Sequence, residues 1–171
     1  MTVFVALLRA INVSGTGILS MADLRALCED AGFTNPTTYI QSGNVVFGTK
    51  LSADKAKAKF EKMLAHKMGK AHGVMLRTAD ELDAILKKVP FKNAEPKSVA
   101  VLFADDAPTK TEMAAITTTG KEEWKLFGSD LIIHYPSGQG ASKLKIPFAK
   151  RGTARNLNTI AKLRDMARDA E

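Results

Sequence analysis

The chain has 171 residues, 45% of them hydrophobic, which is enough to bury a core in one ordinary domain or in two small subdomains. Its formal net charge is +7, and residues 131–164, with seven lysines and arginines and no aspartate or glutamate, account for all of that excess. A single cysteine excludes an intramolecular disulfide, and no apolar stretch approaches the roughly 20 residues that a membrane helix requires.

The first half of the chain predicts strands and helices in the order β-α-β-β-α-β. Val3–Leu8 is a continuous apolar run, typical of a strand buried on both faces. Ser20 and Ser52 each precede apolar residues at helical spacing, so both are predicted helix N-caps. The remaining strands are expected within 37–41, 45–47 and 73–78, with a tight turn at Ser42-Gly43-Asn44.

A connector helix follows. Thr78-Ala79-Asp80-Glu81 is a capping box, and Pro90 ends the apolar helical stripe behind it. The second half then repeats the order of elements. It predicts a strand in 99–104, a helix capped at Thr109, strands in 124–127 and 131–135, a short helix within 143–151, a strand in 153–156 and a C-terminal helix.

This order predicts an α+β protein with two ferredoxin-like (βαββαβ) subdomains in tandem. The expected boundaries are 1–78 for the first, 79–92 for the connector helix, and 93–171 for the second with the C-terminal helix. In the first subdomain, the loop after the first strand is expected to lie at the same end of the sheet as the hairpin turn. In the second subdomain, the loop after the third strand is expected to lie at the same end of the sheet as the end of the fourth strand. The start shows neither a basic region nor a cleavage site, so a cytoplasmic protein without membrane contact is expected.

The basic stretch contains the most suggestive binding segment. Gly138 and Gly140 allow backbone N–H groups to form an anion nest, and Ser142-Lys143 would begin the short helix and add positive charge. Arg155 and Asn156 could reach the same anion with a guanidinium and an amide. The structural alternatives are a strand-to-helix turn that needs glycine, a solvated lysine, an asparagine helix cap and a surface arginine.

A second polar cluster is expected in the first subdomain. Arg9 and Asn12 follow an apolar strand, and Ser42 and Asn44 flank the hairpin turn at the same end of the sheet. They would join the anion site if the two subdomains pack with these ends together. Alternatively, Arg9 satisfies carbonyl groups of the neighbouring turn.

The remaining reactive side chains favour structural roles. His134 could act as a general acid or base, but 131–164 holds no carboxylate to orient it, so a hydrogen-bonded structural histidine is the preferred interpretation. His66 and His72 flank a Lys/Gly turn and are expected in solvent, and Cys28 is expected to be a buried thiol. The histidines and the cysteine show no metal-ligand spacing, so no metal site and no cofactor are predicted.

Several blocks of sequence resemble the bacterial family known as domain of unknown function 1697. They are Arg9-Ala-Ile-Asn-Val, Met21-Ala-Asp-Leu, Thr38-Tyr-Ile-Gln-Ser-Gly-Asn-Val-Val-Phe47, His134-Tyr-Pro, Ser142-Lys-Leu and Thr153-Ala-Arg-Asn-Leu-Asn-Thr159. The resemblance implies a bacterial, cytoplasmic, two-subdomain α+β protein and supplies no activity. The chain departs from the family pattern at Ala10 and Ser14, where glycine is common, and at Leu157, where an aromatic residue is common.

Three functions are compatible with these features. The first is binding of a small anionic, phosphate-bearing ligand at the basic Gly/Ser/Arg/Asn-rich site. The second is a nucleic-acid-binding module that contacts backbone phosphates, for which an RNA-recognition signature is missing. The third is an oligomerisation or adaptor domain. No nucleophile or base can be named, so the sequence predicts neither the presence nor the absence of catalysis. It does not indicate an oligomeric state either.

Overall fold

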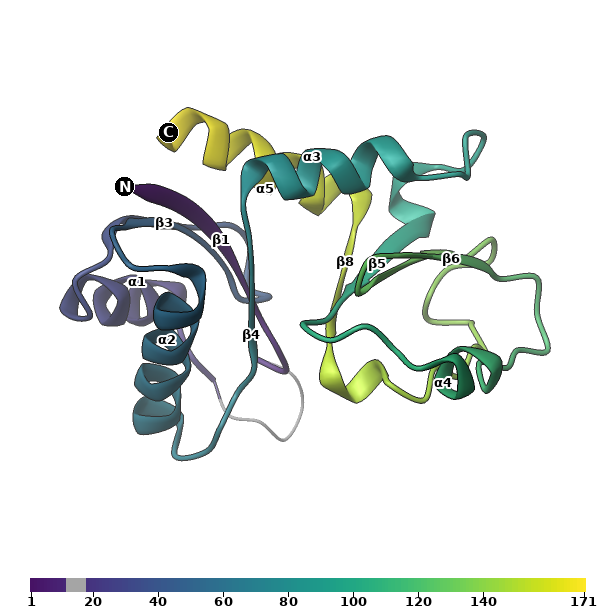
Figure 1. The fold of residues 1–171 in the computed structure, drawn as a ribbon, viewed down its shortest axis with the longest axis horizontal. Coiled ribbons are helices and arrows are strands. Elements are labelled where there is room, and N and C mark those ends of the chain that lie inside the picture. Colours follow the sequence, from purple (N-terminus) through teal and green to yellow (C-terminus); the bar gives the residue numbers. More distant parts are fainter. Residues whose placement is uncertain (12–17) are drawn as a thin grey trace. The chain divides into compact units, whose positions relative to one another are not determined.

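The computed structural model describes residues 1–11 and 18–171 and shows a mixed α+β chain (Figure 1). Within these residues there are five α-helices and two four-stranded antiparallel sheets. The chain divides into two compact units. Unit 1 comprises Met1–Asp83 and Lys162–Glu171, and unit 2 comprises Ala84–Ala161.

Unit 1 follows the predicted order of elements. Its sheet has the strand order β2-β3-β1-β4, and β1 lies in its interior, antiparallel to β3 and β4. The elements are β1 (Thr2–Leu8), α1 (Met21–Asp30), β2 (Thr34–Thr38), β3 (Asn44–Thr49), α2 (Ala53–Met68) and β4 (Val74–Arg77). Both predicted serine caps are confirmed, because Ser20 accepts from the Asp23 N–H and Ser52 from the Lys55 N–H.

The core of unit 1 lies between the sheet and the two helices α1 and α2, which cover one face of it (Figure 1). Four phenylalanines form its centre. The Phe47 ring centroid lies 4.4 Å from Phe33, 5.7 Å from Phe60 and 6.1 Å from Phe4. Cys28 belongs to the same cluster, which confirms the predicted buried thiol, and burial raises the pKa of this thiol to about 12.

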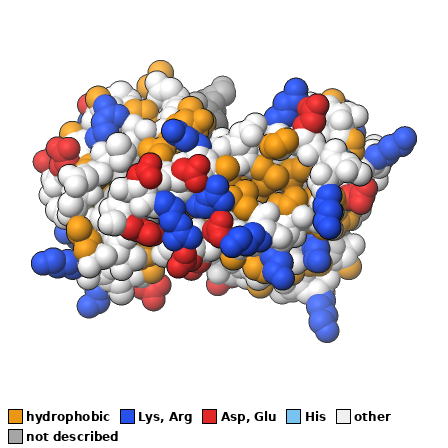
Figure 2. All heavy atoms as spheres, turned by 90° about the horizontal axis from the view of Figure 1, so that it is seen from above, with side chains coloured by type: hydrophobic (Ala, Val, Ile, Leu, Met, Phe, Trp, Pro, Cys, Tyr) orange, Lys and Arg blue, Asp and Glu red, His pale blue; other side chains and the backbone are white. Residues whose placement is uncertain are grey.

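Two further helices each have one part in unit 1 and the other part in unit 2. They are α3 (Ala79–Lys88) and α5 (Leu157–Ala170). Within unit 1, the end of α5 forms ion pairs with the start of α3: Arg164 Nη1 lies 2.9 Å from Asp83 Oδ1, and Arg168 Nη1 lies 2.7 Å from Asp80 Oδ1. Figure 2 shows that basic and acidic side chains lie next to each other on the face of the molecule that it presents.

Unit 2 has the strand order β6-β7-β5-β8, the same arrangement as in unit 1. Its elements are a single 3₁₀ turn (Pro96–Ser98), β5 (Val99–Phe103), α4 (Lys110–Ala114), β6 (Glu123–Phe127), β7 (Asp130–His134), a second 3₁₀ turn (Ala149–Arg151) and β8 (Thr153–Asn156). The Thr109–Glu112 capping box at the start of α4 is present as predicted, with both reciprocal hydrogen bonds formed.

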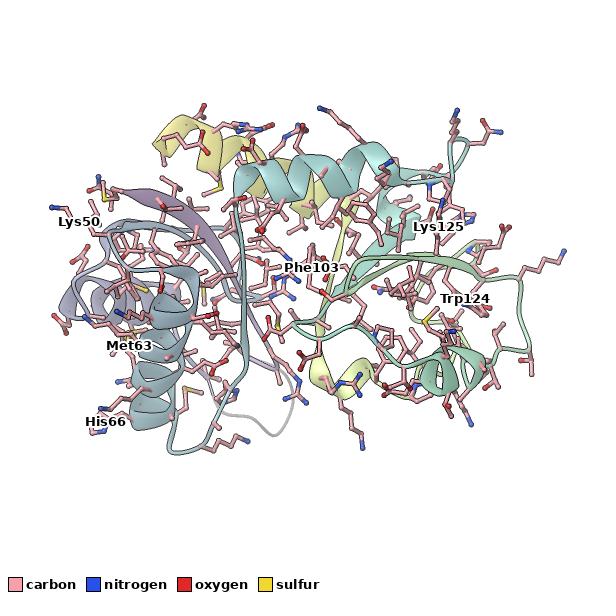
Figure 3. All side chains as sticks on the ribbon, viewed as in Figure 1. Lys50, Met63, His66, Phe103, Trp124 and Lys125 are labelled. Carbon is pink, nitrogen blue, oxygen red and sulfur yellow. The ribbon has the colours of Figure 1, made fainter. Side chains whose placement is uncertain are left out.

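One hydrophobic cluster of unit 2 lies on one face of its sheet, while Val101 and Ile132 are buried on the other face. In the cluster, Leu102, Leu131 and Ile133 pack with Phe148, and the partly buried Trp124 joins them from the edge strand β6. Lys125, the next residue of β6, is exposed, and Figure 3 shows the two side chains on opposite sides of the strand. The alternation of a strand therefore separates a core face from a polar one at β6.

The short helix expected within 143–151 is present only as the 3₁₀ turn Ala149–Arg151, so the helix start expected at Ser142-Lys143 is wrong. Residues 142–148 are irregular, with one bridge between Lys145 and Thr117, and only Ala149–Arg151 form a 3₁₀ turn. Pro147 lacks the N–H that a helix interior needs, and only a few residues separate it from β8. Among the described residues, no helix is long and apolar enough to cross a membrane.

Candidate functional site

Three of the predicted site residues come together at one end of the unit 1 sheet. Leu7 is in register with Asn44 and Leu8 with Val74, so the turns before β3 and β4 flank the end of β1. The Leu8 N–H donates to Gly43 O at 2.9 Å and the Arg9 N–H to Gly73 O at 2.8 Å. The predicted shared end of Arg9, Ser42 and Asn44 is confirmed, while Asn12 lies outside the described residues.

Asn44 organises the hairpin turn. Its side chain is fully buried, and its amide nitrogen donates to Tyr39 O and to Ser42 Oγ, both at 3.0 Å. The backbone beside it is confined as well. Gly43 has φ +81°, and a Cβ there would lie 2.9 Å from Leu8 Cβ. A buried amide on a glycine turn gives this rim a fixed shape.

Two residues of this rim have unusual backbone angles. Ala10 has φ +55° and Ile40 has φ +52°, and both fall in the left-handed region that L-residues avoid at a cost of about 1–2 kcal/mol. Ala10 stands where the resembled family commonly has glycine, which explains that preference. Ile40 is β-branched and 51% exposed, so its conformation is imposed by the turn that Asn44 holds.

His72 also belongs to this end of the sheet, and the expectation that it lies in solvent was wrong. It is 4% exposed, its Nδ1 lies 3.3 Å from Arg9 O, and its Nε2 has no hydrogen-bond partner among the residues that the structure describes. His72 is buried because the segment before β4 returns to the end of β1 and places the ring beneath the Arg9 backbone. No local pattern in the sequence signals this return.

In unit 2 the loop expected to form an anion nest binds a carboxylate of the chain itself. Glu122 Oε1 accepts from Ser142 Oγ at 2.7 Å, Glu122 Oε2 accepts from Thr118 Oγ1 at 2.5 Å, and the Lys143 N–H adds a further bond. The hydrogen bond from Thr118, followed by that from Ser142, lowers the pKa of Glu122 below its usual value. Glu122 therefore fixes the loop between β7 and Lys145.

Replacing either hydroxyl should raise the pKa of the Glu122 carboxyl. A folded-state pKa that is lowered by hydrogen bonds returns toward the ordinary value when a bond is removed, so the carboxyl then protonates at higher pH. Because Thr118 contributes most, Thr118→Val should raise the pKa more than Ser142→Ala. A carbon-13 NMR titration of Glu122 measures both, with Thr119→Val as the control. An unchanged pKa in Thr118→Val would contradict this account.

A cationic hollow lies beside this loop. It measures about 350 Å³ and is lined by Thr117, Thr118, Thr119, Lys143 and Lys145. Lys143 and Lys145 lie two positions apart on an extended segment, so their side chains project to the same side of it. Two backbone hydrogen bonds, of 3.1 and 2.8 Å, join Thr117 to Lys145. Both lysine side chains are exposed, and no described residue forms an ion pair with either. Of the predicted residues only Lys143 lines the hollow, and Lys145 and the threonines were missed because they meet through a long-range bridge.

The glycines of the predicted nest lie at the surface of the same loop. Gly138 has φ +81° and its N–H donates to Tyr135 O, which closes a turn after β7. Gly140 is exposed, and a Cβ at either position would meet no atom of residues 1–11 or 18–171 within 4 Å. These two glycines therefore shape the loop without a close contact that requires them, apart from the positive φ of Gly138.

Arg155 and Asn156 lie on β8, at the end of the sheet that also holds the end of β7. The registers of Val99 with His134 and of Ala100 with Asn156 confirm this predicted neighbourhood. Arg155 is 8% exposed, and its Nη1 donates to Thr153 Oγ1 at 2.7 Å and to Ala154 O at 3.0 Å. Burial lowers the pKa of its guanidinium to about 10, so it is charged at neutral pH. Asn156 Oδ1 accepts from the Thr159 N–H, as a helix cap does.

The described residues thus form an α+β protein with two sheet-based units, each with polar groups at one end of its sheet. No group of three or more potential metal ligands lies among them. The chain belongs to the family described as protein of unknown function (DUF1697), whose model matches residues 1–131. No curated protein matches the chain.

A solved structure supports the fold over nearly the whole length. It is that of conserved bacterial protein SP0830 from Streptococcus pneumoniae, with a TM-score of 0.82 and 23% sequence identity. The similarity covers 98% of this chain and 99% of that chain. At this identity the similarity establishes a shared fold.

Proposed function

We propose that the protein binds a small phosphate-bearing anion in the hollow of Thr117–Thr119, Lys143 and Lys145. The observation that carries the proposal is the pair of lysines, neighbours on one extended segment, for which the described residues offer no ion-pair partner. The two ammonium groups, beside the hydroxyls of Thr117 and Thr119, are donors from which a phosphate accepts hydrogen bonds.

The hydrogen bonds of Glu122 support a preformed site. Because Ser142, Thr118 and the Lys143 N–H hold this carboxylate, the loop that carries the lysines is ordered before a ligand arrives. Preorganisation lowers the entropic cost of binding. The Glu122 charge weakens the attraction for an anion, and the two lysines exceed it by one unit.

The strand order 2-3-1-4 in both units supports the finer description of each as ferredoxin-like. Unit 2 would be a reduced version, in which a 3₁₀ turn stands in place of the second helix. The loop between β7 and β8 then covers the sheet with Leu144, Ile146 and Phe148 and lines the hollow with Lys143 and Lys145.

The test measures binding of inorganic phosphate, pyrophosphate and a nucleotide and sugar-phosphate panel by calorimetry. Lys143→Ala with Lys145→Ala should weaken any binding by at least about tenfold, because each charge-assisted hydrogen bond contributes about 1.5–3 kcal/mol. A double variant that removes the exposed Lys121 and Lys150 loses the same charge outside the hollow and should bind as the unmodified chain does. Equal loss in both double variants, or no binding to any compound, would overturn the proposal.

Contact with nucleic-acid backbones is the alternative outcome of the same experiment. It predicts oligonucleotide affinity that falls steeply with salt, with a log–log slope of about −0.7 per phosphate contacted on single strands. A small-anion site instead binds the mononucleotide as tightly as the oligonucleotide. The two functions are therefore separated by comparing these ligands at two salt concentrations.

A further inference from the structure

A second hollow in unit 2 combines an aromatic wall with charged groups that the fold does not use. It measures about 610 Å³, within the range of small-molecule sites, and lies between residues 90–95 and the ends of β6 and β7. The lining side chains that matter for its chemistry are Phe91, Lys92, Asn93, Glu95, Glu123 and His134.

Its aromatic wall is formed by two rings. The centroids of Phe91 and His134 lie 5.4 Å apart with an interplanar angle of 30°, and both side chains are half-buried. His134 ends β7, and its direct partner across the antiparallel pair is Glu123, the first residue of β6. Residues in direct register project to the same face of a sheet, so the imidazole and the carboxylate lie side by side. Glu123 is thus the neighbouring carboxylate that the sequence between 131 and 164 does not contain.

The charges of the hollow divide into used and unused groups. Glu95 forms an ion pair with Lys97 at 3.5 Å, and its carbonyl accepts from Ser98 Oγ at 2.7 Å. In the described part of the chain, neither Lys92 nor Glu123 has an ion pair, and the Asn93 amide has no hydrogen bond. One ammonium and one carboxylate are therefore left to face the hollow beside an apolar wall.

We propose that this hollow binds a zwitterionic, amino-acid-like ligand. Lys92 pairs with the ligand carboxylate, Glu123 with its ammonium, and the apolar side group packs on Phe91 and His134. One unused charge of each sign matches a molecule of zero net charge better than an anion or a cation, because either of these leaves a protein charge uncompensated. This site is distinct in residues and in ligand charge from the hollow of Thr117–Thr119.

Three probes with the same ring test the charge requirement: L-phenylalanine, phenethylamine and hydrocinnamate. NMR titration of the full chain should show saturable shifts of Phe91 and His134 signals with phenylalanine. The other two probes should bind at least about tenfold more weakly, since each lacks one ion pair. Lys92→Met should abolish the preference over phenethylamine, and Glu123→Gln should abolish the preference over hydrocinnamate.

Lys125→Met provides the matched control, because Lys125 lies on the same strand as Glu123, is exposed and does not line the hollow (Figure 3). It should leave all three affinities unchanged. Lys92, Glu123 and Lys125 are all exposed, so the variants are expected to fold. The proposal is overturned if no probe saturates by about 10 mM, a Kd corresponding to under 3 kcal/mol, or if the ranking of probes is the same in every variant.

Discussion

Phe47→Ala is expected to lower the free energy of unfolding by about 3–5 kcal/mol, the largest effect of any single change considered for this protein. Phe47 is 1% exposed, lies in β3 in register with Phe4, and contacts the rings of Phe33 and Phe60. Truncation removes the ring that joins the sheet to α2, and the surrounding rings cannot close the cavity without moving the helix. A domain at the lower end of ordinary stability, about 5 kcal/mol, would keep little of it.

Urea denaturation followed by circular dichroism measures this loss. Phe91→Ala is the control, since Phe91 is only half-buried at the rim of a hollow and should cost far less. A similar loss in both variants would mean that ring burial in unit 1 is not what holds the sheet to its helices.

Gly152→Ala is expected to destabilise unit 2 by about 2–3 kcal/mol through overpacking. Gly152 has φ −127° and ψ −175°, which any residue adopts, so its backbone conformation is not the reason for glycine. The reason is space. An added Cβ would lie 2.3 Å from the carbonyl oxygen of Phe103 and 3.0 Å from Leu102 Cδ1, and since the first of these is backbone, β5 and β8 would have to separate.

Gly69→Ala is the matched comparison. Gly69 has φ +77° at the end of α2, and a Cβ there would meet no atom of the described residues within 4 Å, so its cost is conformational and about 1 kcal/mol. Hydrogen exchange should show the Gly152→Ala loss concentrated in β5 and β8. A smaller loss in Gly152→Ala than in Gly69→Ala would contradict the steric explanation.

The regular elements could be predicted because their signals are local. The caps at Ser20, Ser52 and Thr109 mark helix starts through bonds to residues only three positions away. The apolar run of β1 reflects burial on both faces, and its pairing puts Arg9, Ser42 and Asn44 together as the topology requires. Such features depend on spacing that the sequence shows directly.

The parts of the structure that could not be predicted depend on contacts between residues that are far apart in the sequence. The bridge between Thr117 and Lys145 forms one side of the cationic hollow. The pairing of Glu123 with His134 forms one side of the hollow that Phe91 also lines. Ser142 and Lys143 carry the expected donors, yet nothing near them in the sequence identifies Glu122 as the acceptor that holds them. The helix start expected at Ser142-Lys143 is wrong for a related reason, because Lys145 pairs with Thr117 instead of continuing a helical turn.

The division of the chain has a consequence for its synthesis. Unit 1 needs both the first 83 residues and the last ten, including buried Leu163 and Ala167 and the arginines that pair with Asp80 and Asp83. The ribosome synthesises Lys162–Glu171 only after every residue of unit 2. Unit 2 can therefore complete its fold before unit 1, whose first 83 residues must wait for Lys162–Glu171.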